Sequence, residues 1–267
     1  MLCWGLERVG FCRWLWGCLP MRLDLCLLTR GLADSRTKAK TLITDGFVSV
    51  NGQVRTKPAF EVDEDNTVTV RESVWDRYVG RGGLKLEAAL DTFGVSPQDK
   101  VCADIGASSG GFTDCLLQRG AKLVYAVDAG SAQLHPKLAA DERVVSMENR
   151  NARYLSPDDF PCVPTLAVMD VSFISQTLIL PAIAEILAEE GDLITLVKPQ
   201  FEVGKEGIGK GGIVKDAQKR KQALQKVKEC AGTLGFSVKG ERESPLRGGD
   251  GNTEYLVWFR KIGTGKM

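Results

Sequence analysis

The stretch that decides the fold is VCADIGASSGGFTD, residues 101–114. Three apolar residues open it, an acid follows at Asp104, and glycines stand at positions 106, 110 and 111. This order is typical of a buried strand that turns through a glycine-rich loop into a helix, whose N-terminus then faces a bound ligand. The loop is suggestive only, because similar turns occur in α/β proteins for purely structural reasons.

The next apolar run, residues 123–128, supports a cofactor site. It ends at Asp128, about 20 residues beyond the loop, where a carboxylate can accept hydrogen bonds from ribose hydroxyl groups. Two cofactors fit this pair of features. A dinucleotide is disfavoured, because the glycines do not follow the G-x-G-x-x-G spacing and Asp104 would repel a pyrophosphate. We therefore favour S-adenosylmethionine, whose ammonium group suits an acid in the loop.

Composition and charge describe an ordinary globular chain. Of its 267 residues, 43% are hydrophobic and 26% are charged, which suits one substantial core with a small second domain. The formal net charge is +1, so any nucleic-acid binding must come from local basic patches rather than from overall charge.

Cysteine and histidine usage argues against disulfides and metal sites. The eight cysteines form no C-x-x-C pair, which favours reduced thiols in the cytoplasm. The single histidine, His135, has no cysteine cluster nearby, so zinc ligation and a Ser-His-Asp triad are both disfavoured. We expect no bound metal.

The chain contains no apolar run long enough to cross a membrane, so no membrane association is expected. Residues 1–20 are aromatic and apolar, but Glu7, Arg8 and Arg13 interrupt them and no small-residue cleavage site follows. We interpret this segment as an extension without a role in the fold, with natural translation starting at Met21.

Residues 21–70 have the pattern of a small α/β module. A helix begins near Arg22 and is closed by Gly31, and Ser35 is placed to cap a second helix that runs to Asp45. The Asn51-Gly52 pair predicts a hairpin turn, and residues 67–70 predict another strand.

The second helix of this module presents basic residues opposite its apolar face. A solvated surface is the ordinary explanation for such charges. However, the segments RLD (22–24), RGLADSR (30–36) and VNG (50–52) resemble the S4 RNA-binding domain. The resemblance implies that the basic helix lies along RNA phosphates. The expected RNA contacts are Arg22, Arg36, Lys38, Lys40 and Arg81.

Beyond a predicted interdomain linker at 71–83, in which Trp75 and Tyr78 could pack, strands alternate with helices over residues 84–262. This order predicts a Rossmann-like, mainly parallel sheet covered on both faces. The expected helices are 84–93, 112–119, 175–189 and 215–234, and the expected strands are 101–105, 123–128, 143–147, 165–170, 192–198, 236–242 and 254–261.

Reactive side chains end three of these strands, at the sheet edge where α/β proteins bind ligands: Asp128, Asp170 and Lys198. A lysine after a buried strand could simply extend into solvent. The glycine-rich segment 204–214 that follows could be an exposed turn or a lid over the site.

Six motifs in the same order resemble the TlyA family, which is related to FtsJ-like RNA 2'-O-methyltransferases and is sometimes labelled haemolysin. They are RGGLKL (81–86), DIGASSGGFTD (104–114), MDVSF (169–173), LVKPQFE (196–202), KGGIV (210–214) and GNTEY (251–255). The resemblance implies methylation of a cytidine ribose in ribosomal RNA by a catalytic tetrad of Lys85, Asp170, Lys198 and Glu254. It leaves open which nucleotide and ribosomal subunit are modified, and the oligomeric state.

The chemistry follows from these residue types. Lys198 is the candidate base for the 2'-hydroxyl; it must be neutral, and the nearby ammonium group of Lys85 favours loss of one proton. Asp170 and Glu254 would orient the lysines, and Asp170 could also contact the ammonium group of the donor. The donor's methionine end is assigned to Asp104, Gly106, Gly110 and Gly111, its ribose to Asp128, and its adenine to the vicinity of Asn151.

Three positions depart from the family pattern, which commonly has threonine at 109, glycine at 132 and histidine at 219. Here they are Ser109, Ala132 and Lys219, and Ala132 lies in the loop expected beside the cofactor ribose.

Two other functions compete with the enzyme. A noncatalytic ribosome-assembly factor would have no need of the tetrad, and a pore-forming haemolysin would need a membrane-active segment that the sequence does not show.

Overall fold

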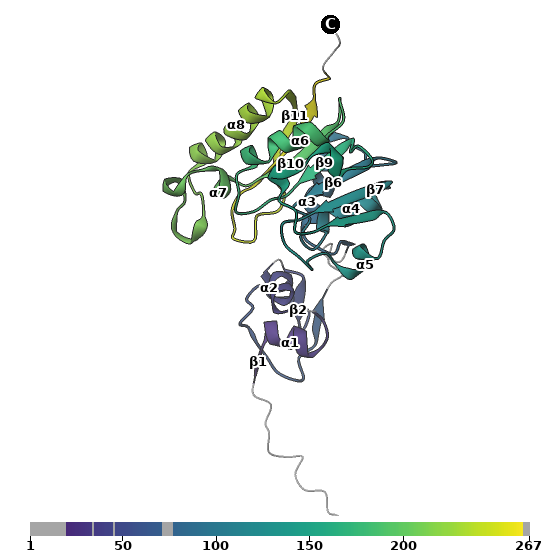
Figure 1. The fold of residues 1–267 in the computed structure, drawn as a ribbon. Coiled ribbons are helices and arrows are strands. Elements are labelled where there is room, and N and C mark those ends of the chain that lie inside the picture. Colours follow the sequence, from purple (N-terminus) through teal and green to yellow (C-terminus); the bar gives the residue numbers. More distant parts are fainter. Residues whose placement is uncertain (1–19, 34, 45, 71–76, 264–267) are drawn as a thin grey trace, which may run out of the picture. The chain divides into compact units, whose positions relative to one another are not determined.

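The computed structural model describes residues 20–33, 35–44, 46–70 and 77–263. The chain divides into two compact units, with the boundary between residues 76 and 77 (Figure 1). Trp75, Asp45 and all but the last residue of the predicted N-terminal extension lie outside the described residues.

The smaller unit is built around two helices, α1 (Leu23–Thr29) and α2 (Arg36–Thr44). Ser35 caps α2 as predicted, because its Oγ accepts a hydrogen bond from the Lys38 backbone N–H at 3.2 Å. The helices bury Leu23, Leu27, Leu42 and Ile43 in one core.

Short strands complete the smaller unit. Strand β2 (Val48–Val50) pairs with β3 (Gln53–Val54) and β5 (Val68–Val70). The predicted hairpin turn is confirmed, since Asn51 and Gly52 have φ angles of 50° and 76°. A separate two-stranded pair, β1 (Met21–Arg22) with β4 (Glu61–Val62), was not predicted, because two residues are too few to show an alternating pattern.

The larger unit contains a seven-stranded sheet with the order β11-β12-β10-β9-β6-β7-β8. Five neighbouring strands are parallel, and β12 is antiparallel to both β10 and β11. The predicted α/β class and mainly parallel sheet are confirmed. The strands are β6 (Val101–Ile105), β7 (Leu123–Val127), β8 (Val144–Met147), β9 (Leu166–Met169), β10 (Asp192–Val197), β11 (Phe236–Glu243) and β12 (Tyr255–Lys261).

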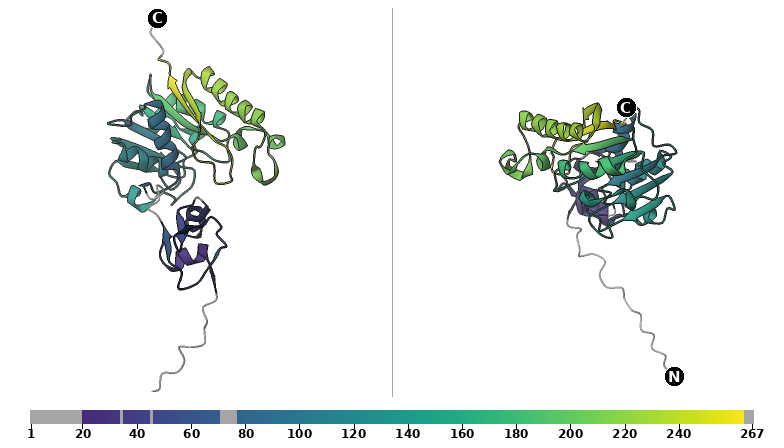
Figure 2. Two further views of the ribbon diagram at one scale, coloured as in Figure 1. Left: turned by 180° about the vertical axis from the view of Figure 1, so that it is seen from behind. Right: turned by 45° about the horizontal axis from the view of Figure 1, so that its top comes forward.

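Helices cover both faces of this sheet, as Figure 2 shows. Alternate strand residues point to opposite faces: Ala103 and Ile105 contribute to one core and Cys102 to the other. The first core is closed by α6 (Leu180–Ile186) and α8 (Ala217–Thr233), and the second by α3 (Gly82–Phe93), α4 (Gly111–Gln118) and α5 (Pro136–Ala139).

Several predicted boundaries are wrong. Helix α3 starts at Gly82, inside the segment expected to link the domains, and Tyr78 is buried within the larger unit. A Cβ atom on Gly83 would lie 2.4 Å from the Tyr78 ring, so the close packing needs glycine. The predicted helix 175–189 is a 3-10 turn, Gln176–Leu178, followed by α6, which has a proline in its first turn. The short helices α5 and α7 (Pro199–Glu202) were missed.

Within the described ranges, every helix is too short or too polar to span a bilayer.

Candidate active site

Strand register brings the predicted catalytic residues to one edge of the sheet. The last pair of the β10–β12 ladder is Val197 with Tyr255, so Lys198 and Glu254 occupy the next antiparallel step. Asp170 directly follows β9, which pairs with β10 in parallel. The carboxyl ends of parallel strands meet at one edge, so the three residues share that edge although they are far apart in sequence.

The four predicted tetrad residues form two ion pairs. Lys198 Nζ lies 2.7 Å from Asp170 Oδ1 and donates a hydrogen bond to Ser172 Oγ at 2.8 Å. Lys85 Nζ donates to Glu254 Oε2 at 2.5 Å. The second pair is deeply buried, with side-chain exposures of 10% and 2%. Each lysine therefore has its own carboxylate, which fixes its position.

Helix α3 brings Lys85 to this edge. Gly82 lies one helical turn before Lys85, and a Cβ atom on Gly82 would stand 3.9 Å from Asp170 Oδ2 and 3.1 Å from the Phe112 ring. Residues three apart share a helix face, so the first turn of α3 presents Lys85 on the side where Asp170 lies.

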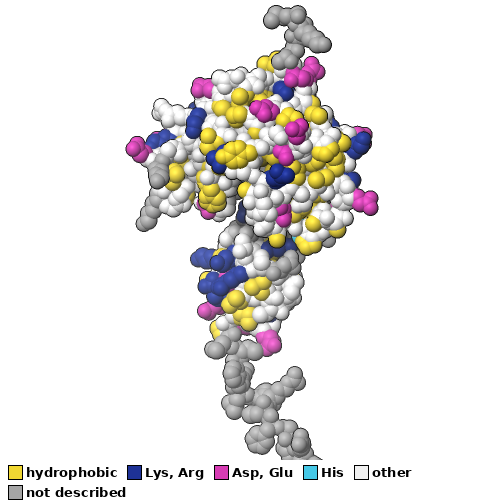
Figure 3. Space-filling model, viewed as in Figure 1, with side chains coloured by type: hydrophobic (Ala, Val, Ile, Leu, Met, Phe, Trp, Pro, Cys, Tyr) yellow, Lys and Arg dark blue, Asp and Glu magenta, His cyan; other side chains and the backbone are white. Residues whose placement is uncertain are grey.

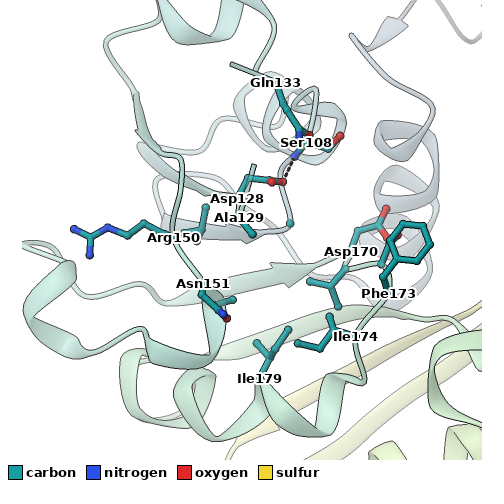
Figure 4. Close-up of a pocket in the computed structure, with 15 residues that line it drawn as sticks. Ser108, Asp128, Ala129, Gln133, Arg150, Asn151, Asp170, Phe173, Ile174 and Ile179 are labelled. Carbon is teal, nitrogen blue, oxygen red and sulfur yellow. Dashed lines mark hydrogen bonds between the residues drawn. The ribbon is translucent and has the colours of Figure 1, made fainter. Parts of the chain in front are cut away.

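Two cavities open at this edge. The larger, of about 420 Å³, lies between the glycine loop, the end of β7 and the segment 170–174 (Figure 4). The smaller, of about 250 Å³, lies between residues 80–82, the glycine loop and Lys198. Both cavities share Gly106, Ser108, Asp170 and Ser172 in their walls. They are therefore neighbouring parts of one site, with Asp170 where they meet.

The glycine loop is shaped by positions where a side chain would be strained or crowded. Gly106 has a φ of 87°, and a Cβ atom there would lie 2.5 Å from the Asp170 carbonyl oxygen. Gly110 has a φ of 93°, and its Cβ would meet Leu138 at 2.2 Å. Gly111 packs against the backbone of Gly80, where a Cβ would be 3.1 Å from the carbonyl oxygen. Of these, Gly106 lines both cavities and Gly111 lines the smaller one.

Asp128 and Asn151 both line the larger cavity. Asp128 Oδ2 accepts a hydrogen bond from the Ser108 N–H at 2.8 Å, drawn in Figure 4, and Oδ1 accepts from the Gly130 N–H at 2.7 Å. Asn151 Oδ1 accepts from the Arg153 N–H at 3.2 Å. These backbone contacts hold the two side chains at the cavity while leaving lone pairs or amide hydrogens for a ligand.

Asp104 lies elsewhere. It is fully buried, is absent from the walls of both cavities, and accepts a hydrogen bond from Thr113 Oγ1 at 2.6 Å. Its Oδ1 has no hydrogen-bond partner among the described residues. Burial, together with the negative charge of Asp170, raises the pKa of this carboxyl to about 7. The side chain of Asp104 therefore contacts α4, the helix that follows the glycine loop, and not the cavities.

Three site residues were not identified from the sequence. Ser172 holds Lys198. Phe173 is 92% exposed and has a φ of 64°, which is unusual for a bulky residue. Glu148 accepts hydrogen bonds from the Ala132 and Gln133 N–H groups at 2.8 and 3.0 Å and so holds the loop beside the cavity. The MDVSF motif contained the first two, but it did not show which side chains would face the site.

Two of the predicted RNA-binding residues of the smaller unit, Arg22 and Arg36, meet on one buried acid. Asp24 is fully buried, and its carboxylate accepts hydrogen bonds from Arg22 Nε at 2.9 Å and from Arg36 Nε at 3.3 Å. Hydrogen bonding to Arg22 holds the pKa of Asp24 below its usual value. Both arginines remain about half exposed, and Figure 3 shows Lys and Arg side chains gathered on this unit. Lys40 is exposed as predicted, whereas Lys38 is half-buried.

The fifth predicted RNA contact, Arg81, belongs to the larger unit, where it lines the smaller cavity together with Lys198. In the part of the chain that the structure describes, no three His, Cys, Asp or Glu side chains are grouped closely enough to hold a metal ion.

Comparisons with known proteins agree with this architecture. Residues 78–261 match the FtsJ-like methyltransferase family, and residues 21–68 match the S4 domain. YqxC of Bacillus subtilis is 49% identical over 246 residues, which is 92% of this chain and 87% of that protein. The 16S/23S rRNA (cytidine-2'-O)-methyltransferase TlyA of Mycobacterium tuberculosis is 43% identical over 239 residues, covering 90% of this chain and 89% of its own length.

A solved structure from Streptococcus thermophilus has a TM-score of 0.73 and 47% identity, and it covers 91% of this chain and 89% of its own. These similarities extend over both units. The chain belongs to the TlyA family, in which an S4 domain precedes an FtsJ-like methyltransferase domain.

Proposed function

We propose that this protein transfers the methyl group of S-adenosylmethionine to the 2'-hydroxyl of a cytidine ribose in ribosomal RNA. The observation that carries the proposal is the Lys198–Asp170 pair, 2.7 Å apart, which stands where two adjoining cavities meet. One cavity can take a donor and the other an acceptor. The name of the Mycobacterium tuberculosis relative supports this acceptor class.

The larger cavity suits the donor. Its volume of about 420 Å³ is in the range of small-molecule sites, and the bare glycine backbone allows close approach. Asp128 would accept hydrogen bonds from the ribose hydroxyls, and Asn151 would face the adenine. The glycine loop, which lies between Asp104 and α4, would hold the methionine end. When bound, the donor supplies an electrophilic methyl group on a positively charged sulfur.

The acceptor hydroxyl needs a group that takes its proton as the oxygen attacks. We assign this role to Lys198 Nζ, which Asp170 and Ser172 hold in place. Asp170 faces both cavities, so its negative charge is shared between Lys198 and a cationic ligand. This sharing favours release of a proton from Lys198 when the site is full. The Lys85–Glu254 pair would fix the neighbouring helix and strand edge.

RNA would reach the site through exposed groups. Phe173 presents a nearly bare ring beside Asp170, where an unstacked base could lie against it. Arg81 lines the smaller cavity and can contact a phosphate. In the smaller unit, Asp24 holds Arg22 and Arg36 in an arrangement suited to the RNA backbone.

The direct test is transfer of labelled methyl from S-adenosylmethionine to separated small and large ribosomal subunits that lack the modification. We expect label in at least one subunit. Donor binding without label on either subunit or on free rRNA would contradict the proposal and favour a noncatalytic assembly factor on a methyltransferase scaffold.

A further inference from the structure

One buried acid at this edge of the sheet has no part in the chemistry above. Glu202 ends α7, four residues after Lys198, and its side chain is only 1% exposed. Glu202 Oε2 accepts a hydrogen bond from Ser175 Oγ at 2.5 Å, and Oε1 accepts from the Gln176 N–H at 2.7 Å. Burying a carboxylate costs free energy unless hydrogen bonds compensate for the lost water, so these two bonds stabilise Glu202 in its buried position.

The contacts of Glu202 join two loops that carry the reacting groups. Residues 170–176 follow β9 and contain Asp170 and Ser172, which hold Lys198. Residues 198–202 follow β10 and contain Lys198 itself. The carboxylate of Glu202 therefore ties the far end of the first loop to the far end of the second.

The same network extends into the sheet. Gln176 Nε2 donates to the Leu196 carbonyl oxygen at 2.8 Å, and Gln176 Oε1 accepts from Thr195 Oγ1 at 2.8 Å. Thr195 and Leu196 lie in β10 immediately before the end that carries Lys198. The loop that follows Asp170 is thus anchored both to the strand before Lys198 and to the helix after it.

Lys198 itself also joins the two loops, through Asp170 and Ser172. The remaining contacts around Glu202 are weaker. The rings of Phe173 and Phe201 are 5.1 Å apart, but Phe173 is 92% exposed, so little apolar surface is buried there. Lys226 lies on α8 rather than on either loop. Its Nζ is 3.9 Å from Glu202 Oε2 and donates a hydrogen bond to the Glu202 carbonyl oxygen at 3.2 Å, and its side chain is 52% exposed, so solvent screens its charge. Charge-assisted hydrogen bonds to a buried carboxylate are the stronger restraint.

We propose that Glu202 is a positioning residue for methyl transfer: it holds the loop of Asp170 and Ser172 against Lys198. This inference rests on the proposed function. A shift of the loop by about 1 Å would separate the base from its partners, and displacements of that size can slow an enzyme by about 100-fold. The loss should be larger in kcat than in the KM for S-adenosylmethionine, because the loop positions the base but forms only one wall of the larger cavity, to which the glycine loop and Asp128 also contribute.

The test is steady-state methyl transfer to ribosomal subunits by the full-length wild-type protein and by Glu202→Ala and Glu202→Gln. For Glu202→Ala we expect kcat to fall by about 10- to 100-fold, while the KM for S-adenosylmethionine changes by less than about threefold. Glu202→Gln should recover most of the rate, because its amide oxygen can accept from Gln176 N–H and its amide nitrogen can donate to Ser175 Oγ.

Asp192→Ala is the matched control for lost stability. Asp192 is also a buried acid, lies at the other end of β10, and accepts hydrogen bonds from Trp258 and Arg260. The Asp192→Ala substitution should lower the melting temperature while leaving kcat near the wild-type value. Melting temperatures of all variants are measured in parallel.

The outcomes separate the two proposals. If the wild type transfers methyl and Glu202→Ala does so at the same kcat, or if Asp192→Ala loses as much kcat for the same loss of stability, the positioning role is wrong and the proposed function stands. If the wild type itself transfers no methyl to rRNA, the proposed function fails and the positioning role fails with it.

Discussion

The two ends of strand β10 carry similar charged clusters, to which we assign different roles. At its start, Asp192 accepts hydrogen bonds from Trp258 Nε1 at 2.9 Å and from Arg260 Nε at 3.0 Å, and it lies 3.3 Å from Lys100 Nζ. Just beyond its other end, Lys198 pairs with Asp170. Both clusters combine a lysine with a shielded acid, so an ion pair at a strand end does not by itself indicate catalysis.

The difference lies in what surrounds each cluster. Asp192 is saturated by protein donors and takes no part in the two cavities of the site. Asp170 stands between those cavities, beside Gly106, whose backbone lines both of them. We conclude that space next to the pair, rather than the pair itself, distinguishes the reactive end of the sheet from the structural end.

Removing the lysine at each end of β10 should give the largest difference in the rate of methyl transfer. Lys198→Ala should lower the rate of methyl transfer by about 100- to 10,000-fold, because it removes the group to which we assign the proton of the hydroxyl. Lys100→Ala should keep turnover near the wild-type value. Single-turnover assays with saturating donor measure both. Equal losses in the two variants would show that the two ends are not functionally distinct.

The acid at the structural end should affect stability instead. Asp192→Ala leaves the Trp258 N–H, Lys100 and Arg260 without their shared acceptor. We expect the free energy of unfolding to fall by about 2 kcal/mol. This is less than for a fully buried ion pair, because Lys100 and Arg260 are partly exposed. Urea unfolding measures this cost. An unfolding free energy equal to that of the wild type would mean that the cluster contributes nothing.

The buried carboxyl of Asp104 should make the free energy of unfolding depend on pH. Its pKa is about 7 when folded and about 4 when unfolded, so the folded protein holds the carboxyl neutral at pH values where the unfolded chain has ionised it, and the full stability is present only below about pH 4. That stability is lost as the pH rises through 7. Asp104→Asn stays neutral, so the wild type should lose stability relative to this variant between about pH 4 and 7. Parallel curves of unfolding free energy against pH would contradict the assignment.

The smallest expected effect concerns the loop at the rim of the larger cavity. Ala132 has a φ of 52°, a conformation that favours glycine, and the family pattern commonly has glycine there. Ala132→Gly should stabilise the protein by about 0.5 kcal/mol, since relief of strain slightly exceeds the entropy cost of glycine. Thermal unfolding would detect the gain, and a lower melting temperature would show that Ala132 is not strained.

The sequence predicted the fold where patterns were long or chemically distinctive. Strand β6 has the predicted bounds, and the residues at the ends of β7, β9 and β10 lie at one edge as expected. Short elements such as β1, β4 and α7 were missed, because two to four residues show no periodicity.

Partners distant in sequence were harder to predict. The Lys85–Glu254 bond joins residues 169 apart, and Glu202 meets Ser175 across 27 residues. Such pairings depend on strand order and register, which local patterns do not specify. The burial of Asp104 was missed for the same reason: the loop motif shows that an acid is present, but not that the sheet and α4 enclose it.

The most direct test of the reactive end is nucleoside mass spectrometry of rRNA after incubation with S-adenosylmethionine and the wild type, Lys198→Ala or Lys100→Ala. The proposed function predicts 2'-O-methylcytidine with the wild type and Lys100→Ala, and none above background with Lys198→Ala. Undiminished 2'-O-methylcytidine with Lys198→Ala, or a methyl group found on a base instead of a ribose, would contradict the account.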